Sequence, residues 1–480
     1  MPEYEIVIGL ETHIQLNTKS KIFCGCKADS WEDEPNTNIC PICSGLPGTL
    51  PVLNAAAVEK AVLLAKAMDS EIREESFFDR KNYFYPDLPK GYQITQFDKS
   101  VASGGYIDLP MDGYTRRVTI EKLHLEEDAG KTKHNGGEWM VDFNRCGVPL
   151  VEMVTAPDLR SADEAAEYLI RLRQILRWLD ISEANMEKAH LRADANVSIR
   201  IKGENILNTK TEIKNVNSIE AVRTAINVEV KRQIKEVEAG REIKAWTLGW
   251  DEDTLSLKKM RSKETEADYR YFKEPDLMRV NLTGEWKEKI LAYFPKLPLE
   301  VRDEFIEKYM LPKYDAEILT SERSLSQYFR DVIDAYGYQP AQVKRVSNWL
   351  MNDVMKIMNE KNIEAGLLKI TPSHLAEIIT MNDEKMINTP TAKSLLEKVE
   401  ESGRSPKEIV EEEGLAQVSD SGALEEIAKT LIAENPDQAQ KFRDGKESLI
   451  GWFVGQIMRQ TQGKADPELT KKVLLEQLKE

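Results

Sequence analysis

Four cysteines near the beginning of the chain have the spacing of a metal site. Cys24 and Cys26 form one short pair, and Cys40 and Cys43 form a second pair after an interval of 13 residues. Four thiolates at this spacing suit a tetrahedral zinc ion, with metal–sulfur bonds of about 2.3 Å. Two disulfides or four ordinary thiols are the alternatives, but a chain with five cysteines in 480 residues is typical of a reducing compartment. We therefore expect a closed, structural zinc site.

A carboxylate and an imidazole lie two positions apart in a segment of alternating polarity. In residues 6–16, apolar and polar side chains alternate, which predicts a β-strand with Glu11 and His13 on its polar side. Side chains at positions i and i+2 of a strand point the same way and lie about 7 Å apart. Such a pair can share one metal ion or one phosphate group, although a solvated strand face explains the same pattern.

Three consecutive carboxylates, Glu126, Glu127 and Asp128, follow an apolar segment that contains His124. Like charges repel, so bringing them together costs free energy that a bound divalent cation would remove. Mg²⁺ prefers oxygen ligands and often bridges protein carboxylates to substrate phosphates. If the strand continues, Glu126 shares the face of His124, and Glu127 points to the other face. A solvated turn is the alternative.

Glu152 interrupts the apolar run 148–154. Burial of an unpaired charge is unfavourable, so this carboxylate needs a partner. A metal ion and Arg145 are equally good candidates on this pattern alone.

The segment 77–92 mixes cations with aromatic rings. Its candidate ligands for a nucleotide are Arg80, Lys81, Tyr83 and Lys90. Rings stack on bases and cations hold phosphates, as a nucleotide or an unpaired RNA end requires. A small aromatic core under a proline-containing loop is the alternative.

Residues 191–200 and 209–214 predict two neighbouring strands, and Asp194 lies on the polar side of the first. The charged residues that share a face of the second are Lys210, Glu212 and Lys214. Surface ion pairing explains this cluster as easily as a phosphate site does.

The composition describes a folded protein with an acidic balance. Lys and Arg number 66 and Asp and Glu number 82, so the net charge is −16, and 41% of the residues are hydrophobic. This balance excludes a disordered chain, a collagen-like fibre and a small disulfide-rich protein. Nucleic acid would bind only through local basic patches. The low cysteine content predicts a reducing, cytoplasmic location. We expect no membrane span, because no apolar stretch reaches ~18 residues, and no targeting peptide, because the N-terminus is acidic.

The first ~290 residues and the last ~190 differ in pattern. The first part shows strand-like alternation and one clear helix, which we expect to begin after Ser218 and to end at Gly240. The second part reads as a series of helices. A capping residue followed by proline marks five of the expected starts, at Thr371, Thr389, Ser405, Asn435 and Asp466.

Together, these segments resemble the B subunits of the aspartyl/glutamyl-tRNA amidotransferases. The resemblance covers essentially the whole chain. The matching stretches include residues 8–13, 78–93, 124–131, 144–150, 192–198, 268–272 and 445–455. It implies an α+β protein in three parts: a catalytic cradle domain with a mixed, largely antiparallel sheet in residues 1–295, an all-α helical domain in 296–404, and a small helical tail in 405–480 that contacts tRNA.

The resemblance also implies a reaction. ATP phosphorylates the side-chain carboxylate of Glu or Asp misattached to tRNA(Gln) or tRNA(Asn), and ammonia converts the acyl phosphate to Gln or Asn. A separate glutaminase subunit supplies the ammonia, and a small third subunit joins the two. The residues expected around Mg²⁺ are Glu11, His13, Glu126, Glu127 and Glu152. Those expected to bind the nucleotide are Arg80, Lys81, Tyr83, Lys90, Asp194, Lys210 and Glu212.

Two other functions stay open on the sequence. A non-catalytic tRNA-binding scaffold would use the acidic cluster only for folding. A metal-dependent hydrolase is disfavoured, because the sequence lacks an HExxH motif and a serine-nucleophile elbow. Cys146 has no evident histidine partner, so we expect no glutaminase nucleophile in this chain.

Overall fold

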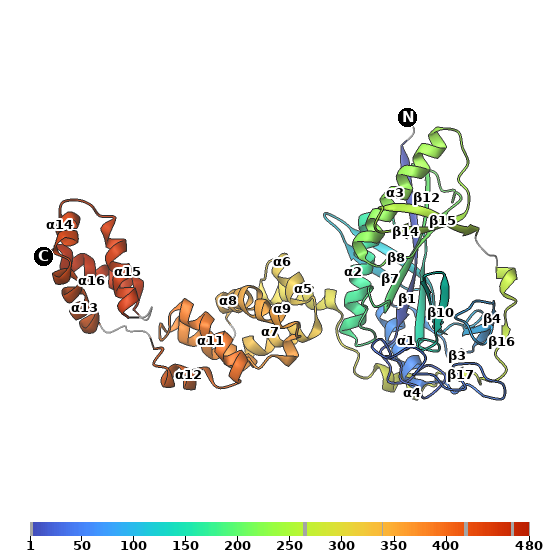
Figure 1. Ribbon diagram of the computed structural model, residues 1–480, viewed down its shortest axis with the longest axis horizontal. Helices are drawn as coiled ribbons and strands as arrows, with labels where there is room; N and C mark the ends of the chain where they lie inside the picture. Colours follow the sequence, from blue (N-terminus) through green and yellow to red (C-terminus); the bar gives the residue numbers. More distant parts are fainter. Residues whose placement is uncertain (1–2, 263–265, 338, 417–420, 462–464, 480) are drawn as a thin grey trace. The chain divides into compact units, whose positions relative to one another are not determined.

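The computed structural model describes residues 3–262, 266–337, 339–416, 421–461 and 465–479 (Figure 1). The chain divides into two compact units, Met1–Leu297 and Pro298–Glu480. The first combines a large sheet with helices, and the described residues of the second form helices and connecting segments. This is the predicted α+β class with a helical C-terminal region.

A ten-stranded mixed sheet forms the centre of the first unit. Its strands are β1 (Tyr4–Gln15), β2 (Glu71–Ile72), β6 (Ala102–Ser103), β7 (Tyr106–Pro110), β8 (Thr115–Glu127), β11 (Pro149–Thr155), β12 (Leu191–Ile201), β13 (Thr211–Lys214), β14 (Trp246–Asp251) and β15 (Ser256–Ser262). Their order is β15-β14-β13-β12-β1-β11-β8-β6-β2, and β7 pairs with β8 outside this path. Strands β13 and β14 are parallel, and the other neighbours are antiparallel.

Among the described residues, smaller sheets and four helices complete this unit. The sheets are β16-β4-β5, the hairpin β9-β10 and the pair β17-β3. Their strands are β3 (Glu75–Ser76), β4 (Asp79–Asn82), β5 (Tyr92–Thr95), β9 (Lys131–Asn135), β10 (Glu138–Asp142), β16 (Phe272–Lys273) and β17 (Val280–Asn281). The helices are α1 (Ala55–Ala67), α2 (Ala162–Trp178), α3 (Ile219–Glu238) and α4 (Gly284–Leu291), and Glu266–Tyr269 forms one 3₁₀ turn.

The two faces of the large sheet differ in polarity. On β1, Leu10, Thr12 and Ile14 are buried in a core on the side of α2 and α3; α3 packs against β12, and α2 packs against α3 (Figure 1). The alternate residues Glu11 and His13 point to the opposite face and stay partly exposed. This alternation confirms the predicted strand and its polar row, because successive strand residues must point to opposite faces.

Helix α3 begins where the sequence predicts. The Ser218 side chain accepts a hydrogen bond from the Ala221 backbone N–H, which satisfies one of the free donors at the helix start. The helix ends at Glu238, and Gly240 follows with a φ of +72°, a left-handed conformation that suits glycine at a helix end.

The second unit contains helices α5 to α16. They are α5 (Pro298–Tyr309), α6 (Lys313–Leu319), α7 (Arg323–Tyr336), α8 (Pro340–Trp349), α9 (Met355–Lys361), α10 (Pro372–Asp383), α11 (Thr389–Ser402), α12 (Pro406–Glu412), α13 (Ser421–Glu434), α14 (Pro436–Arg443), α15 (Leu449–Gln460) and α16 (Pro467–Lys479). A π-helical segment, Leu350–Val354, joins α8 to α9, and Ala365–Leu367 is a 3₁₀ turn.

The proline-marked helix starts are all observed, but their caps differ. Thr371 and Asp466 accept hydrogen bonds from backbone N–H groups of the following turn. Helix α11 begins one residue earlier than predicted, because Asn388 rather than Thr389 caps it. Ser405 makes no capping bond, and the Asn435 amide instead donates to the Leu431 carbonyl at 2.9 Å. Proline therefore marked a helix start in all five cases, whereas the expected capping hydrogen bond forms in only some of them.

Two groups of helices in this unit have separate packing. Helix α12 packs against α10 and α11, whereas residues from α13 to α16 share a core that includes Leu424, Phe453 and Leu474. The finer division into 296–404 and 405–480 stays a prediction. No helix in the described part of the chain is long and apolar enough to cross a membrane.

Candidate active site and cysteine centre

A row of polar side chains crosses four neighbouring strands on the polar face of the large sheet. Strand register pairs His13 of β1 with Arg192 of β12 on one side and with Glu152 of β11 on the other. Glu152 in turn pairs with His124 of β8. The Nε2 atoms of His13 and His124 each lie 3.5 Å from Glu152 Oε2. The sheet thus brings together residues that are far apart in the sequence.

Three more carboxylates surround His13. Its Nε2 lies 3.7 Å from Glu11 Oε1 and 3.9 Å from Glu126 Oε1. Asp194 pairs with Glu11 across β12 and β1. Ligand atoms of His13, Glu126 and Glu152 lie within 4.8 Å of one another, and so do those of Glu11, His13 and Asp194. We call Glu11, His13, Glu126, Glu152 and Asp194 the carboxylate cluster.

The cluster carries an excess of negative charge, which the pKa of His13 reflects. Burial acts to lower this pKa, but the hydrogen bond to Glu152 and the charge of Glu152 raise it to about 9. Burial and the charge of Glu152 also raise the pKa of Glu11. Burial acts to raise the pKa of Glu152, but the charge of His124 and the bond from His13 lower it overall. The centre therefore favours a cation, and its oxygen-rich donor set fits Mg²⁺.

Two adjoining pockets, of about 740 and 340 Å³, open over the cluster, and this is the size range of small-molecule sites. Both are lined by Glu11, Lys81, Glu126, Glu152, Lys214 and Tyr269. The Lys81 ammonium lies 4.6 Å from the centre of the Tyr269 ring, and among the described residues it makes no ion pair. Lys214 instead pairs with Asp194 at 2.6 Å. The pockets therefore combine a carboxylate cluster with nearby cations.

The acidic run 126–128 is divided among three environments. Glu126 faces the cluster and accepts a hydrogen bond from Thr95 Oγ1 at 3.2 Å. Strand β8 continues through Glu127, whose carboxylate therefore points to the opposite face. There it pairs with Lys90 and accepts the Ile94 N–H at 2.8 Å. Of the predicted Glu126/Glu127 pair, only Glu126 lies in the cluster.

Asp128 and Arg145 form a separate group. Asp128 pairs with Arg192 at 3.1 Å and with Arg145 at 3.5 Å. Arg145 also donates to the carbonyls of Ala129 and Gly130. The hypothesis that Arg145 neutralises Glu152 is therefore wrong. The partners of Glu152 are His13 and His124.

The predicted nucleotide ligands separate into two sets. Lys81, Tyr83 and Glu212 line the pockets, and Asp194 lies in the cluster. Arg80 points away from the pockets, because it neighbours Lys81 on β4, and it forms a two-bond ion pair with Glu274 at 2.7 and 2.8 Å. Lys90 is held by Glu127, and Lys210 is an exposed residue just before β13.

Sequence reasoning did not assign Arg192, His124 and Lys214 to the site. The period-2 pattern placed each on a polar strand face, but only the pairing register shows which strands are neighbours. The aromatic segment is divided as well. Phe78 is buried, whereas Phe84 and Tyr85 line the larger pocket with 82% and 55% of their surface exposed.

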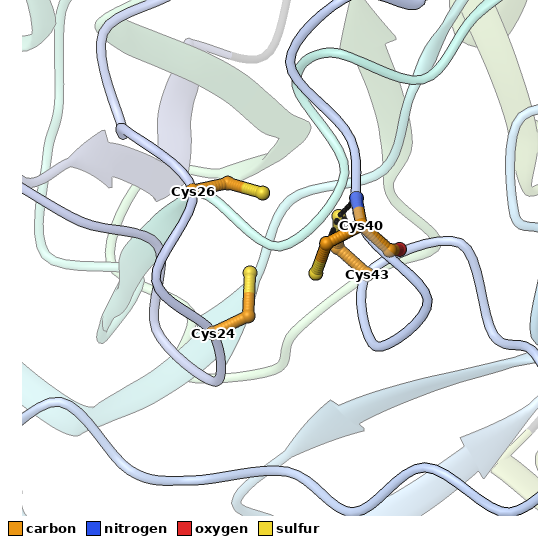
Figure 2. Close-up of side chains that lie close together, drawn as sticks. All are labelled: Cys24, Cys26, Cys40 and Cys43. Carbon is orange, nitrogen blue, oxygen red and sulfur yellow. Dashed lines mark hydrogen bonds between the residues drawn. The ribbon is translucent and has the colours of Figure 1, made fainter.

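The four predicted cysteine ligands converge (Figure 2). Cys24 and Cys26 come from the loop after β1, Cys40 and Cys43 from the segment before α1, and Figure 2 shows the four side chains directed toward a common centre. Their sulfur atoms lie within 4.8 Å of one another, and all four are free thiols rather than disulfides. This set can hold a metal ion, and four thiolates fit zinc.

Hydrogen bonds stabilise the thiolate form of Cys43 and attach the cysteine loop to the turn before β11. The bond from the Cys24 thiol is the largest cause of the lowered pKa of Cys43, about 4, and burial opposes it. The Cys40 N–H also donates to Cys43 Sγ at 3.2 Å. The Asn38 N–H donates to Asn144 Oδ1 at 2.8 Å, close to the start of β11. The cysteine loop is therefore hydrogen-bonded to the segment that precedes β11.

Comparison with known proteins shows the family of this chain. The family model described as the GatB/GatE catalytic domain matches residues 6–288, and that described as the GatB domain matches residues 327–478. The aspartyl/glutamyl-tRNA(Asn/Gln) amidotransferase B subunit of Persephonella marina is 45% identical over 99% of this chain and 100% of its own length. The corresponding B subunit of Thermodesulfovibrio yellowstonii is 46% identical over 100% of both chains. The chain therefore belongs to the GatB family, the B subunits of the aspartyl/glutamyl-tRNA(Asn/Gln) amidotransferases.

Proposed function

We propose that this chain activates and then amidates the side-chain carboxylate of Glu or Asp misattached to tRNA(Gln) or tRNA(Asn). A carboxylate oxygen attacks the γ-phosphorus of ATP, and ADP leaves. Ammonia attacks the carbonyl carbon of the resulting acyl phosphate, and inorganic phosphate leaves as the amide forms. The observation that carries this proposal is the carboxylate cluster beneath a pocket that Lys81 also lines.

The cluster is the proposed Mg²⁺ site. Glu11, Glu126 and Glu152 supply oxygen ligands, with Asp194 beside them, and His13 is a ligand of a kind that Mg²⁺ seldom uses. The bound ion would offset the negative charge that develops on the transferred phosphoryl group. Lys81 is the proposed phosphate ligand, because its ammonium lies at the pocket wall without a carboxylate partner in the described part of the chain.

We propose that the ammonia comes from another protein. Cys146 is buried, and burial and the charge of Glu127 raise its pKa to about 12, whereas a nucleophilic cysteine needs an accessible thiolate. We propose that a glutaminase subunit supplies ammonia and that a small third subunit joins the complex. The chain would act in the cytoplasm, where its five free cysteines stay reduced and the four-cysteine centre binds structural zinc.

The test supplies free ammonia and so makes the glutaminase unnecessary. The chain, purified with the glutaminase and the small subunit, is mixed with ATP, Mg²⁺, ammonium chloride and tRNA charged with labelled Glu or Asp, and the released amino acid is identified. We expect Gln or Asn from the wild-type chain and none from Glu152→Gln. Glu121→Gln, on the same sheet but at an exposed position, is the control. Full conversion by folded Glu152→Gln would instead favour the scaffold hypothesis.

A further inference from the structure

Lys21 is a fully buried lysine beside the cysteine centre. Its side chain has 0% of its surface exposed. Its Nζ atom lies 2.9 Å from the Asn38 carbonyl oxygen and 3.6 Å from Cys43 Sγ. The second distance fits a hydrogen bond to sulfur. The ammonium group therefore contacts one of the four predicted metal ligands directly.

Lys21 forms no ion pair with a carboxylate in the described part of the chain. Within the ranges that the structure describes, no Asp or Glu oxygen lies within 4.0 Å of its Nζ atom. A buried ammonium is strongly unfavourable without a compensating negative group. The group that can supply a negative charge within hydrogen-bond distance of Lys21 is the Cys43 sulfur. The chain therefore retains a buried positive charge beside four thiols.

Other lysines near the centre have carboxylate partners. Lys27, in the same loop, is 57% exposed and pairs with Asp33 at 2.6 Å. Lys90 pairs with Glu127. Only Lys21 is hydrogen-bonded to sulfur among the lysines of the described residues. Its burial and its contact therefore distinguish it from a surface lysine.

The net charge of a zinc-loaded cysteine centre indicates a role for Lys21. Zinc carries a charge of +2 and four thiolates carry −4, so the loaded centre has a net charge of −2. We propose that Lys21 is a positioning residue and counter-charge of this centre: its ammonium donates to Cys43 Sγ, stabilises the thiolate and strengthens metal binding. This inference rests on the proposed zinc site and goes beyond its four ligands.

The test measures zinc affinity in the full chain by competition with a chromophoric chelator. Lys21→Met keeps an unbranched side chain of similar length and removes the charge. Loss of a partner of a metal ligand typically weakens metal binding about 10- to 100-fold, and we expect a loss in that range. Lys27→Met removes a lysine from the same loop without touching sulfur, and we expect wild-type affinity from it.

Cobalt substitution separates counter-charge from simple packing. A thiolate that loses a positive neighbour holds its electrons less tightly, so its charge-transfer band to Co²⁺ moves to lower energy. We expect this shift in Lys21→Met and not in Lys27→Met. A side chain that only packed the loop would leave the band of the loaded centre unchanged.

The possible failures can be told apart. A wild-type chain that binds no zinc overturns the metal site and this inference together. Wild-type zinc affinity and an unmoved cobalt band in Lys21→Met overturn the role of Lys21 alone. If Lys21→Met does not fold, Lys21→Gln, which keeps a donor but loses the charge, is measured in the same way. Wild-type affinity in Lys21→Gln contradicts the proposal.

Discussion

The cysteine centre and the carboxylate cluster are built in opposite ways. The four cysteines lie within residues 24–43, and two short pairs in one loop region supply every ligand. The carboxylate cluster draws Glu11, Glu126, Glu152 and Asp194 from four strands that span most of the first unit. A local motif can be read from spacing, whereas a site spread over a sheet depends on the order and register of its strands.

Their charges are balanced differently as well. At the cysteine centre the buried cation is Lys21, whose ammonium group donates a hydrogen bond to Cys43 Sγ. The carboxylate cluster has several cations around it: Arg192, Lys214 and Lys81 all line its larger pocket. Two of these cations, Lys214 and Arg192, pair with Asp194 and Asp128, whereas Lys81 makes no ion pair in the described part of the chain. The carboxylate cluster thus lies beside a cation that could bind a substrate phosphate, whereas the cation of the cysteine centre is hydrogen-bonded to a metal ligand.

The largest effect should follow from removing metal from the cysteine centre. Structural zinc contributes about 10–16 kcal/mol in small zinc-dependent domains, so a chelator should open the loop that the metal holds. Hydrogen exchange should accelerate at the amides of Val52 and Asn54, which pair with Phe23 and Ile22. Amides of β12 should keep their protection. Equal acceleration in both regions would mean that the centre is not a local clamp.

Glu127→Gln should destabilise the fold. This change removes the charge of a buried carboxylate that Lys90 faces, and leaving such a partner unpaired typically costs about 3–5 kcal/mol. Denaturant unfolding measures the loss. Per folded molecule, the conversion of Glu-tRNA should fall far less than it does in Glu126→Gln.

Glu126→Gln, one residue away, should show the reverse. The substitution weakens one oxygen donor of the carboxylate cluster. Loss of one group that stabilises developing charge typically lowers kcat about 10²- to 10³-fold. The unfolding midpoint should change little, because Gln still accepts the Thr95 bond. Equal activities for the two variants would refute the assignment of Glu126 and Glu127 to opposite faces.

Asn144→Ala tests the attachment of the cysteine loop to the segment before β11. The Asn144 side chain accepts the Asn38 N–H and donates to the Glu34 carbonyl at 2.7 Å, and it is almost fully buried. Loss of buried partners of this kind costs about 1–3 kcal/mol. Zinc should dissociate faster from this variant. An unchanged dissociation rate would show that the cysteine loop does not need this anchor.

Ser218→Ala should have the smallest effect. It removes the cap of α3, which typically costs about 1 kcal/mol. A small fall in the melting temperature should accompany unchanged zinc content and unchanged conversion of Glu-tRNA. Helix α3 lies on the apolar face of the sheet, opposite the carboxylate cluster. A change in zinc content or in conversion would therefore contradict this expectation and show that α3 influences one of the sites.

The sequence predicts the local cysteine motif more completely than the carboxylate cluster, whose residues come from four strands. Cysteine spacing identified the cysteine set, and period-2 alternation placed Glu11 with His13 and separated Glu126 from Glu127. The same rule distinguishes Lys81 from Arg80, because neighbours on a strand face opposite ways. Alternation cannot show that Arg192 faces His13 or that His124 faces Glu152. Those pairs depend on the strand order β12-β1-β11-β8, which only the packed sheet fixes.

We propose that the carboxylate cluster supports transfer of phosphate from ATP to the substrate carboxylate. The most direct test follows oxygen. The tRNA is charged with Glu that carries ¹⁸O in its side-chain carboxylate, and the phosphate released during amide formation is analysed by mass spectrometry. We predict one ¹⁸O atom in each phosphate from the wild-type chain and no labelled phosphate from Glu152→Gln. Unlabelled phosphate during wild-type conversion, or equal labelling in both chains, would contradict the account.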